Sequence, residues 1–126
     1  MSIKKSDGYE WSADNLIEGY GLSADNPIEV TMVPAEYTYL DSLYFWDGSP
    51  IYYKRIRPCH TFDREYPIDI FAIYRRPDDA AKGVEPIVEL YLYGYADCNT
   101  MDAPEGFILK IDRPDLWMMP PVWKHR

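Results

Sequence analysis

The segment Cys59–Glu65 gathers side chains that could bind a metal ion or act as a nucleophile. Cys59, His60 and Asp63 offer a thiol, an imidazole and a carboxylate, which are the ligand types that zinc takes from proteins. A zinc site needs three or four ligands, however, and the sequence holds neither a Cys-x-x-Cys pair nor a His-x-His pair; its one other histidine is His125. Neighbours such as Cys59 and His60 point in opposite directions in an extended segment, so they are poorly placed to form a thiolate–imidazole pair. We therefore interpret this segment as a structural loop and keep a metal-assisted enzyme around His60 as a third functional hypothesis.

A second polar segment, residues 97–105, carries the carboxylates of Asp97, Asp102 and Glu105. It departs from the Ca²⁺-binding loop pattern, because Met101 stands where the fifth position requires an oxygen ligand and no glycine follows it. The glycines of the chain are scattered, and they form neither a dinucleotide-binding fingerprint nor a nucleophile elbow. We expect a solvated acidic loop here. We assign no catalytic residue, no metal and no cofactor, and we lean towards a protein that is not an enzyme.

The charge of the chain bears on its partners. The formal net charge is −8, which disfavours general nucleic-acid binding because such binding depends on basic side chains that neutralise phosphates. Basic residues nevertheless gather in residues 54–76, where six bases stand against three acids. If the strands of this region pair antiparallel, Arg55 lies near Asp69, and Arg75 lies beside the turn that contains Asp47. We therefore predict a salt-bridged surface rather than an anion site.

Tyrosine supplies 12 of the 126 residues, and three of them alternate along one segment as Tyr91, Tyr93 and Tyr95. A period of two places these rings on one face of a strand, opposite Leu90 and Leu92, which we predict to face the core. Tyrosine has an apolar body and a polar tip, so a row of this kind suits a core edge, a subunit interface or a ligand groove.

We take the tyrosine row, with Trp117 and Trp123, as the candidate binding surface. Two interpretations remain open. In one, the N-terminal segment or a C-terminal arm covers the row as a second packed layer. In the other, the row is a surface that contacts a second copy, a protein partner or a flat ligand such as a sugar.

Six short strands are predicted to position these residues. Runs of apolar and aromatic residues separated by turn signals place them at residues 28–32, 37–46, 51–57, 68–74, 87–96 and 107–112. The segment Asp47–Pro50 predicts a tight turn that joins the second and third strands as a hairpin. Residues 68–74 are apolar on both faces, which is typical of a central strand.

The pattern as a whole predicts a mainly β fold. We expect an antiparallel meander that curls into a barrel or sandwich, with at most one short N-terminal helix at residues 13–19. A parallel pair is not expected, because no strand–helix–strand alternation is visible. The chain fits a single domain, 1–126, in which residues 1–27 form an N-terminal turn or helix segment and residues 114–126 form an extended arm packed on it.

Compartment and function follow from what the sequence contains. No stretch reaches the ~20 apolar residues of a membrane helix, and no signal peptide is recognisable at the start, so we expect a cytoplasmic protein. Cys59 and Cys98 make no disulfide framework, although one bridge between them stays open. Our first hypothesis is a small acidic interaction protein, of a kind that phages or mobile elements encode, which self-associates or binds a protein partner through its aromatic and apolar surface. The second is a ligand-binding β-barrel or sandwich with a carbohydrate-like ligand.

Overall fold

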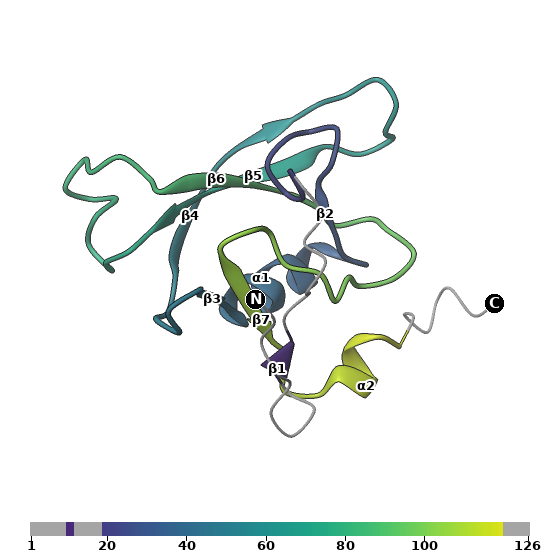
Figure 1. Cartoon of the computed structure of the whole chain (residues 1–126). Helices are drawn as coiled ribbons and strands as arrows, with labels where there is room; N and C mark the ends of the chain where they lie inside the picture. Colours follow the sequence, from purple (N-terminus) through teal and green to yellow (C-terminus); the bar gives the residue numbers. More distant parts are fainter. Residues whose placement is uncertain (1–9, 12–18, 120–126) are drawn as a thin grey trace.

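The computed structural model describes residues 10–11 and 19–119 of the chain (Figure 1). The elements run in the order β1 (Glu10–Trp11), β2 (Ile28–Glu29), α1 (Val33–Asp41), β3 (Leu43–Phe45), β4 (Tyr52–Cys59), β5 (Ile68–Tyr74), β6 (Val88–Tyr93), β7 (Phe107–Lys110) and α2 (Pro114–Trp117). The strands form a three-stranded sheet of order β1-β7-β3 and a four-stranded sheet of order β2-β6-β5-β4. The mainly β prediction is confirmed. The prediction of an antiparallel meander curled into a barrel or sandwich is wrong, because the two sheets are neither closed nor curled and one of them contains a parallel pair.

The four-stranded sheet contains the part of the meander that was predicted correctly. β4, β5 and β6 pair antiparallel in chain order, and all seven residues of β5 are buried, as the prediction of a central strand requires. Leu90 and Leu92 of β6 are both 0% exposed and belong to the core, whereas Tyr91 and Tyr93 point to the opposite face. The predicted register of β6 is therefore confirmed.

The fourth strand of this sheet contradicts the expectation of antiparallel pairing throughout. β2 pairs with β6 in parallel, with Ile28 opposite Leu92 and Glu29 opposite Tyr93. The pairing is carried on by a hydrogen bond from the Val30 amide to the Tyr93 carbonyl. A parallel neighbour needs a long crossover connection, and the chain from α1 to β5 supplies it. Because this crossover holds other strands as well as a helix, no simple strand–helix–strand pattern reveals it in the sequence.

Helix α1 replaces the first half of the strand predicted at residues 37–46, and β3 occupies part of the second half. Pro34 lies in its first turn, where the missing amide hydrogen costs nothing and the fixed φ suits a helix. The buried residues of α1 are Ala35, Glu36, Tyr39 and Leu40, a spacing that forms one face of a helix and not of a strand. The alternation of Tyr37 and Tyr39 favoured a strand, but the core-facing pattern has the helical period.

The predicted turn at Asp47–Pro50 forms, but the hairpin around it does not. Gly48 adopts φ 87° and donates its amide hydrogen to the Phe45 carbonyl, which tightens the turn. β3 then pairs with β7 and not with β4, and the Phe45 and Phe107 rings stack with their centroids 5.5 Å apart. A contact between segments far apart in the sequence thus decides the partner of β3.

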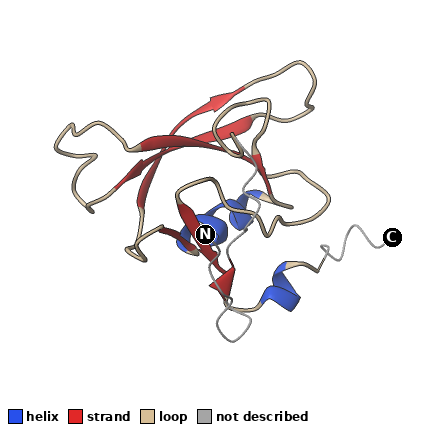
Figure 2. Ribbon diagram, viewed as in Figure 1, coloured by secondary structure: helices blue, strands red, loops and turns tan. Residues whose placement is uncertain are grey.

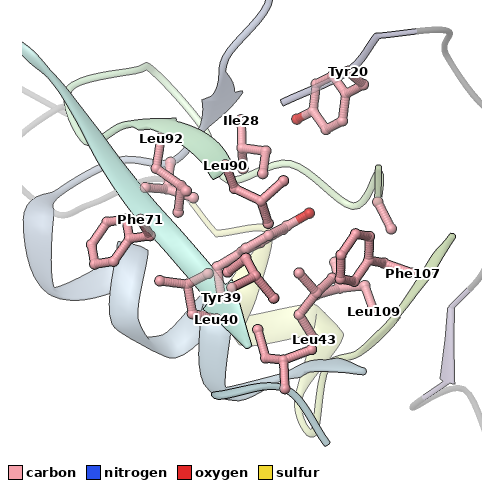
Figure 3. Close-up of a cluster of buried hydrophobic side chains, with 14 of the residues drawn as sticks. Tyr20, Ile28, Tyr39, Leu40, Leu43, Phe71, Leu90, Leu92, Phe107 and Leu109 are labelled. Atoms are coloured by element: carbon pink, nitrogen blue, oxygen red, sulfur yellow. The ribbon is translucent and has the colours of Figure 1, made fainter. Parts of the chain in front are cut away.

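The core lies between the four-stranded sheet on one side and α1 with the β3–β7 pair on the other (Figure 3). Both helices lie on the same side of the four-stranded sheet (Figure 2). The Tyr39 hydroxyl reaches through this core and donates a hydrogen bond of 2.7 Å to the Asp102 carbonyl, so its polar tip is satisfied.

The C-terminal part of the described chain differs from the prediction. Pro114–Trp117 forms the short helix α2 where an extended arm was expected, and Trp117 is buried with the core. Most of the helix predicted at residues 13–19 lies outside the described residues, as does Trp123.

Candidate functional site

Four residues form an aromatic surface at one end of the four-stranded sheet, which we call the tyrosine patch: Arg64, Tyr66, Tyr93 and Tyr95. Tyr66, from the loop between β4 and β5, stacks on Tyr95 with ring centroids 4.2 Å apart and an interplanar angle of 19°. Tyr95 also contacts Tyr93 at 5.7 Å. Tyr66 and Tyr95 are 44% and 42% exposed, whereas Tyr93 is buried beneath them. The patch is therefore a pair of stacked, half-exposed rings on a buried third.

Arg64 fixes the patch from below. Its guanidinium carbon lies 4.6 Å from the centroid of the Tyr93 ring, a cation–π contact, and its Nη1 lies 3.3 Å from Oε2 of Glu29. The Arg64 side chain is mostly buried, so the positive charge is held between an aromatic face and a carboxylate. Each patch residue has a partner that restricts it, and the Arg64–Glu29 ion pair balances its own two charges. The carboxylate of Glu65 lies against Tyr66 and raises the pKa of its hydroxyl, so the edge of the patch also carries a negative charge.

The loop that supplies Tyr66 also presents Phe62, whose side chain is fully exposed. A fully exposed phenylalanine leaves a large apolar area in water, which is unfavourable unless something covers it. Phe62 lies in the same loop between β4 and β5, two residues from Arg64 and four from Tyr66.

The structure brings together some of the residues that were predicted for the candidate surface and separates others. Tyr93 and Tyr95 lie together as expected, and Tyr91, the third member of the row, is half-buried. Trp117 does not join them: it is buried, and its indole Nε1 donates 2.7 Å to the Thr100 carbonyl. Sequence reasoning missed Tyr66 and Arg64, because nothing local indicates that the loop after β4 folds over β6.

The residues weighed as metal ligands do not form a site. Within the described part of the chain, no group of three or more His, Cys, Asp or Glu side chains could hold a metal ion. Cys59 ends β4, and His60 and Asp63 lie exposed in the loop after it. Cys59 and Cys98 are both free, so the bridge that the sequence left open is not formed.

The basic strip is paired as predicted. Arg55 donates to Asp69 from Nε at 3.1 Å and from Nη2 at 2.9 Å, and Arg75 lies 3.1 Å from Asp47 beside the turn. The Arg55 and Arg75 side chains are about half exposed, and exposed pairs contribute only about 0–1 kcal/mol each to stability. These contacts are part of the surface and do not form an anion site.

A groove of about 480 Å³ lies between the first turns of α1 and helix α2. Met32, Leu116 and Met119 line it with exposed apolar side chains, and Asn99 and Trp117 form its floor. We assign this groove no function.

One buried acid was not predicted at all. Glu36 of α1 is 1% exposed, and neither of its carboxyl oxygens has a hydrogen-bond donor within the described residues. Burial and the neighbouring carboxyl of Asp69 raise the pKa of Glu36 to about 9, against a smaller opposing effect of Arg55. Because the sequence predicts a strand at residues 37–46, it gives no reason to expect that Glu36, just before that strand, is buried in the core.

No helix in the described part of the chain is long and apolar enough to cross a membrane. No model of a known protein family matches the chain, and neither a curated protein nor a solved structure shows significant similarity to it. The function must therefore be argued from the geometry of the chain itself.

Proposed function

We propose that this protein is a non-catalytic interaction protein that self-associates through the tyrosine patch and the neighbouring Phe62. The observation that carries the proposal is the exposed Tyr66–Tyr95 stack, held rigidly by Tyr93 and Arg64. Tyrosine, phenylalanine and arginine are enriched at the centres of protein interfaces, and side chains already fixed in place lose little entropy on binding.

Charge favours a second copy as the occupant. The chain carries a net charge of −8, so most pairs of faces from two copies repel each other. At the patch this repulsion is smaller, because the Arg64–Glu29 ion pair balances its own charges and Glu65, beside Tyr66, is the acid that remains. Two copies related by a twofold axis can meet there with Phe62 of each against Tyr66 of the other, since such an interface uses the same surface twice.

The edge of the sheet offers a less suitable contact. β4 is an edge strand, but Lys54, Arg55 and Arg57 line it with charges, its register shifts between Arg55 and Arg57, and Pro58 lacks an amide donor. Charges, bulges and prolines of this kind prevent edge-to-edge pairing. Side chains of the patch, and not strand addition to β4, therefore supply the proposed contact.

Sedimentation velocity at 10–200 µM tests the proposal. We expect a concentration-dependent dimer that persists at 500 mM NaCl, because burial of apolar surface is insensitive to ionic screening. Phe62→Ser and Tyr66→Ala should each weaken the dimer at least tenfold. Trp46→Ser is the matched control, since Trp46 is 43% exposed but lies by the turn at the other end of the β4–β5 hairpin.

Two results would overturn the proposal. A monomer at 200 µM would show that the patch does not bind a second copy. A dimer that survives both patch substitutions but is lost in Trp46→Ser would place the interface elsewhere.

A further inference from the structure

The buried carboxyl group of Glu36 needs a chemical explanation, because an ionised carboxylate without a donor is costly to bury. The charged groups that act on it are Asp69 of β5 and, in the opposite direction, Arg55 of β4, and with both acids ionised neither Glu36 oxygen has a donor. Two ionised carboxylates cannot form a hydrogen bond, since both only accept. One proton on the pair resolves the difficulty: Glu36 then donates to Asp69 and no longer carries a buried charge.

The groups around the pair are consistent with one negative charge and not two. From β4, Arg55 donates twice to Oδ1 of Asp69 and balances its charge. From α1, Tyr37 acts on Arg55, and its ring packs on Phe71 at 5.5 Å. From β6 the neighbour is Gly94, which brings no side chain. With the proton in place the cluster of Glu36, Asp69 and Arg55 is neutral; without it, a net negative charge remains in the core.

Gly94 connects this cluster to the tyrosine patch. A Cβ atom added at Gly94 would lie 2.7 Å from Oε2 of Glu36 and 3.1 Å from the amide nitrogen of Val33, so the start of α1 packs directly on the β6 backbone. Gly94 follows the last residue of β6 and lies in the chain between Tyr93 and Tyr95, two residues of the patch. The Glu36 carboxyl therefore lies against the short backbone segment that joins Tyr93 to Tyr95.

We propose that the proton shared by Glu36 and Asp69 holds α1 against the Tyr93–Tyr95 segment, and that its loss at alkaline pH loosens α1 and weakens association through the patch. The regulatory half of this inference rests on the proposed function, whereas the shared proton does not. Ionisation would place a second negative charge beside Asp69 in the core, and α1 can relieve that repulsion only by moving away from the sheet.

The direction of the pH effect follows from proton linkage. An unfolded glutamate has a pKa near 4.5, and the folded-state pKa of Glu36 is about 9, so the folded chain binds one more proton between these values. The stabilisation is complete below pH 4.5 and is lost as the pH rises towards 9. Over that window the folding equilibrium constant falls by up to tenfold per pH unit.

Glu36→Gln isolates this effect, because the amide still donates to Asp69 but cannot ionise. Urea unfolding of both proteins from pH 6 to 9 should show a wild-type stability that falls relative to Glu36→Gln, by up to tenfold in the ratio of folding constants per pH unit. Parallel pH profiles would overturn the shared proton. Hydrogen exchange of the α1 amides at each pH, taken as a ratio to the variant, should show wild-type α1 loosening as the pH rises.

Carbon NMR of the side-chain carboxyls in the wild-type protein keeps the inference testable if Glu36→Gln fails to fold. We expect the Glu36 carboxyl to titrate near pH 9, and a transition near pH 4.5 would overturn the inference. Sedimentation at pH 7 and 9.5 tests the regulation: the wild-type dimer should dissociate at pH 9.5 and the Glu36→Gln dimer should persist. A wild-type monomer at both pH values would overturn the proposed function and its regulation, while the NMR titration would still decide the shared proton. A dimer indifferent to pH would refute the regulation alone.

Discussion

Asn99 should be among the residues on which stability most depends, although it lies in a loop. Its side chain is 8% exposed and joins three segments: Oδ1 accepts from the Thr31 amide at 2.8 Å, and Nδ2 donates to the Trp117 carbonyl at 2.9 Å. The amide thus connects the approach to α1 with the end of α2 through the loop between β6 and β7. It is also the kind of buried polar group that is retained only when both of its ends are satisfied.

Asn99→Ala removes both hydrogen bonds and leaves two backbone groups without a partner. Each unsatisfied buried group costs about 1–3 kcal/mol, so we expect a loss of about 2–6 kcal/mol in the free energy of unfolding. A domain of this size has about 5–15 kcal/mol in total, so the variant should be markedly less stable. Urea unfolding measures the loss, and Glu105→Ala, an exposed position in the same loop, should change stability by less than about 0.5 kcal/mol.

Asn99→Asp tests the contributions of the two Asn99 hydrogen bonds separately. The carboxylate still accepts from the Thr31 amide, but it replaces the donor that faces the Trp117 carbonyl with an oxygen. Loss of protection should then concentrate in α2, visible as faster exchange of the Trp117 indole proton, which bonds to the Thr100 carbonyl. A cost below about 1 kcal/mol for Asn99→Ala, with Trp117 exchange unchanged, would refute the reasoning, because water would then have replaced the side chain at no cost.

Three further predictions concern core packing and metal binding. Leu90→Ala should lower the free energy of unfolding by about 2–5 kcal/mol, because Leu90 is fully buried; a loss below about 1 kcal/mol would contradict the register of β6. Gly94→Ala should cost about 1–3 kcal/mol in the same assay, since its methyl group would collide with Glu36 and with the Val33 backbone; a neutral effect would show that α1 moves freely away from β6. EDTA should leave the melting temperature unchanged, and a fall that added zinc or calcium reverses would revive a site at His60 or in the acidic loop.

Local pattern was sufficient wherever neighbouring segments pair with each other. β4, β5 and β6 follow one another in the chain and in the sheet, so alternation and turn signals located all three strands. The same local pairing placed Arg55 beside Asp69 and Arg75 beside Asp47. The exposed Asp47–Pro50 turn was also predictable, because its geometry depends on its own residues.

Local pattern failed wherever a distant segment decides the outcome. Residues 33–41 have both strand-like alternation and a helical face, and the helix forms because Tyr39 and Leu40 then reach the core between the two sheets. β3 pairs with β7 and does not form the expected hairpin with β4, because Phe107 and Leu109 of β7 complete the same core.

The candidate site was likewise predictable from the sequence only in part. The sequence determined by itself that Tyr91 and Tyr93 lie on one face of β6 and that Leu90 and Leu92 lie on the other, because a strand has a period of two. Only the tertiary structure decided that Tyr66 stacks on Tyr95 and that Glu36 lies buried behind Gly94. The physical reason is that the period of a helix or strand fixes the direction in which each of its side chains points. Stacking and burial depend instead on which distant segment packs against that side chain.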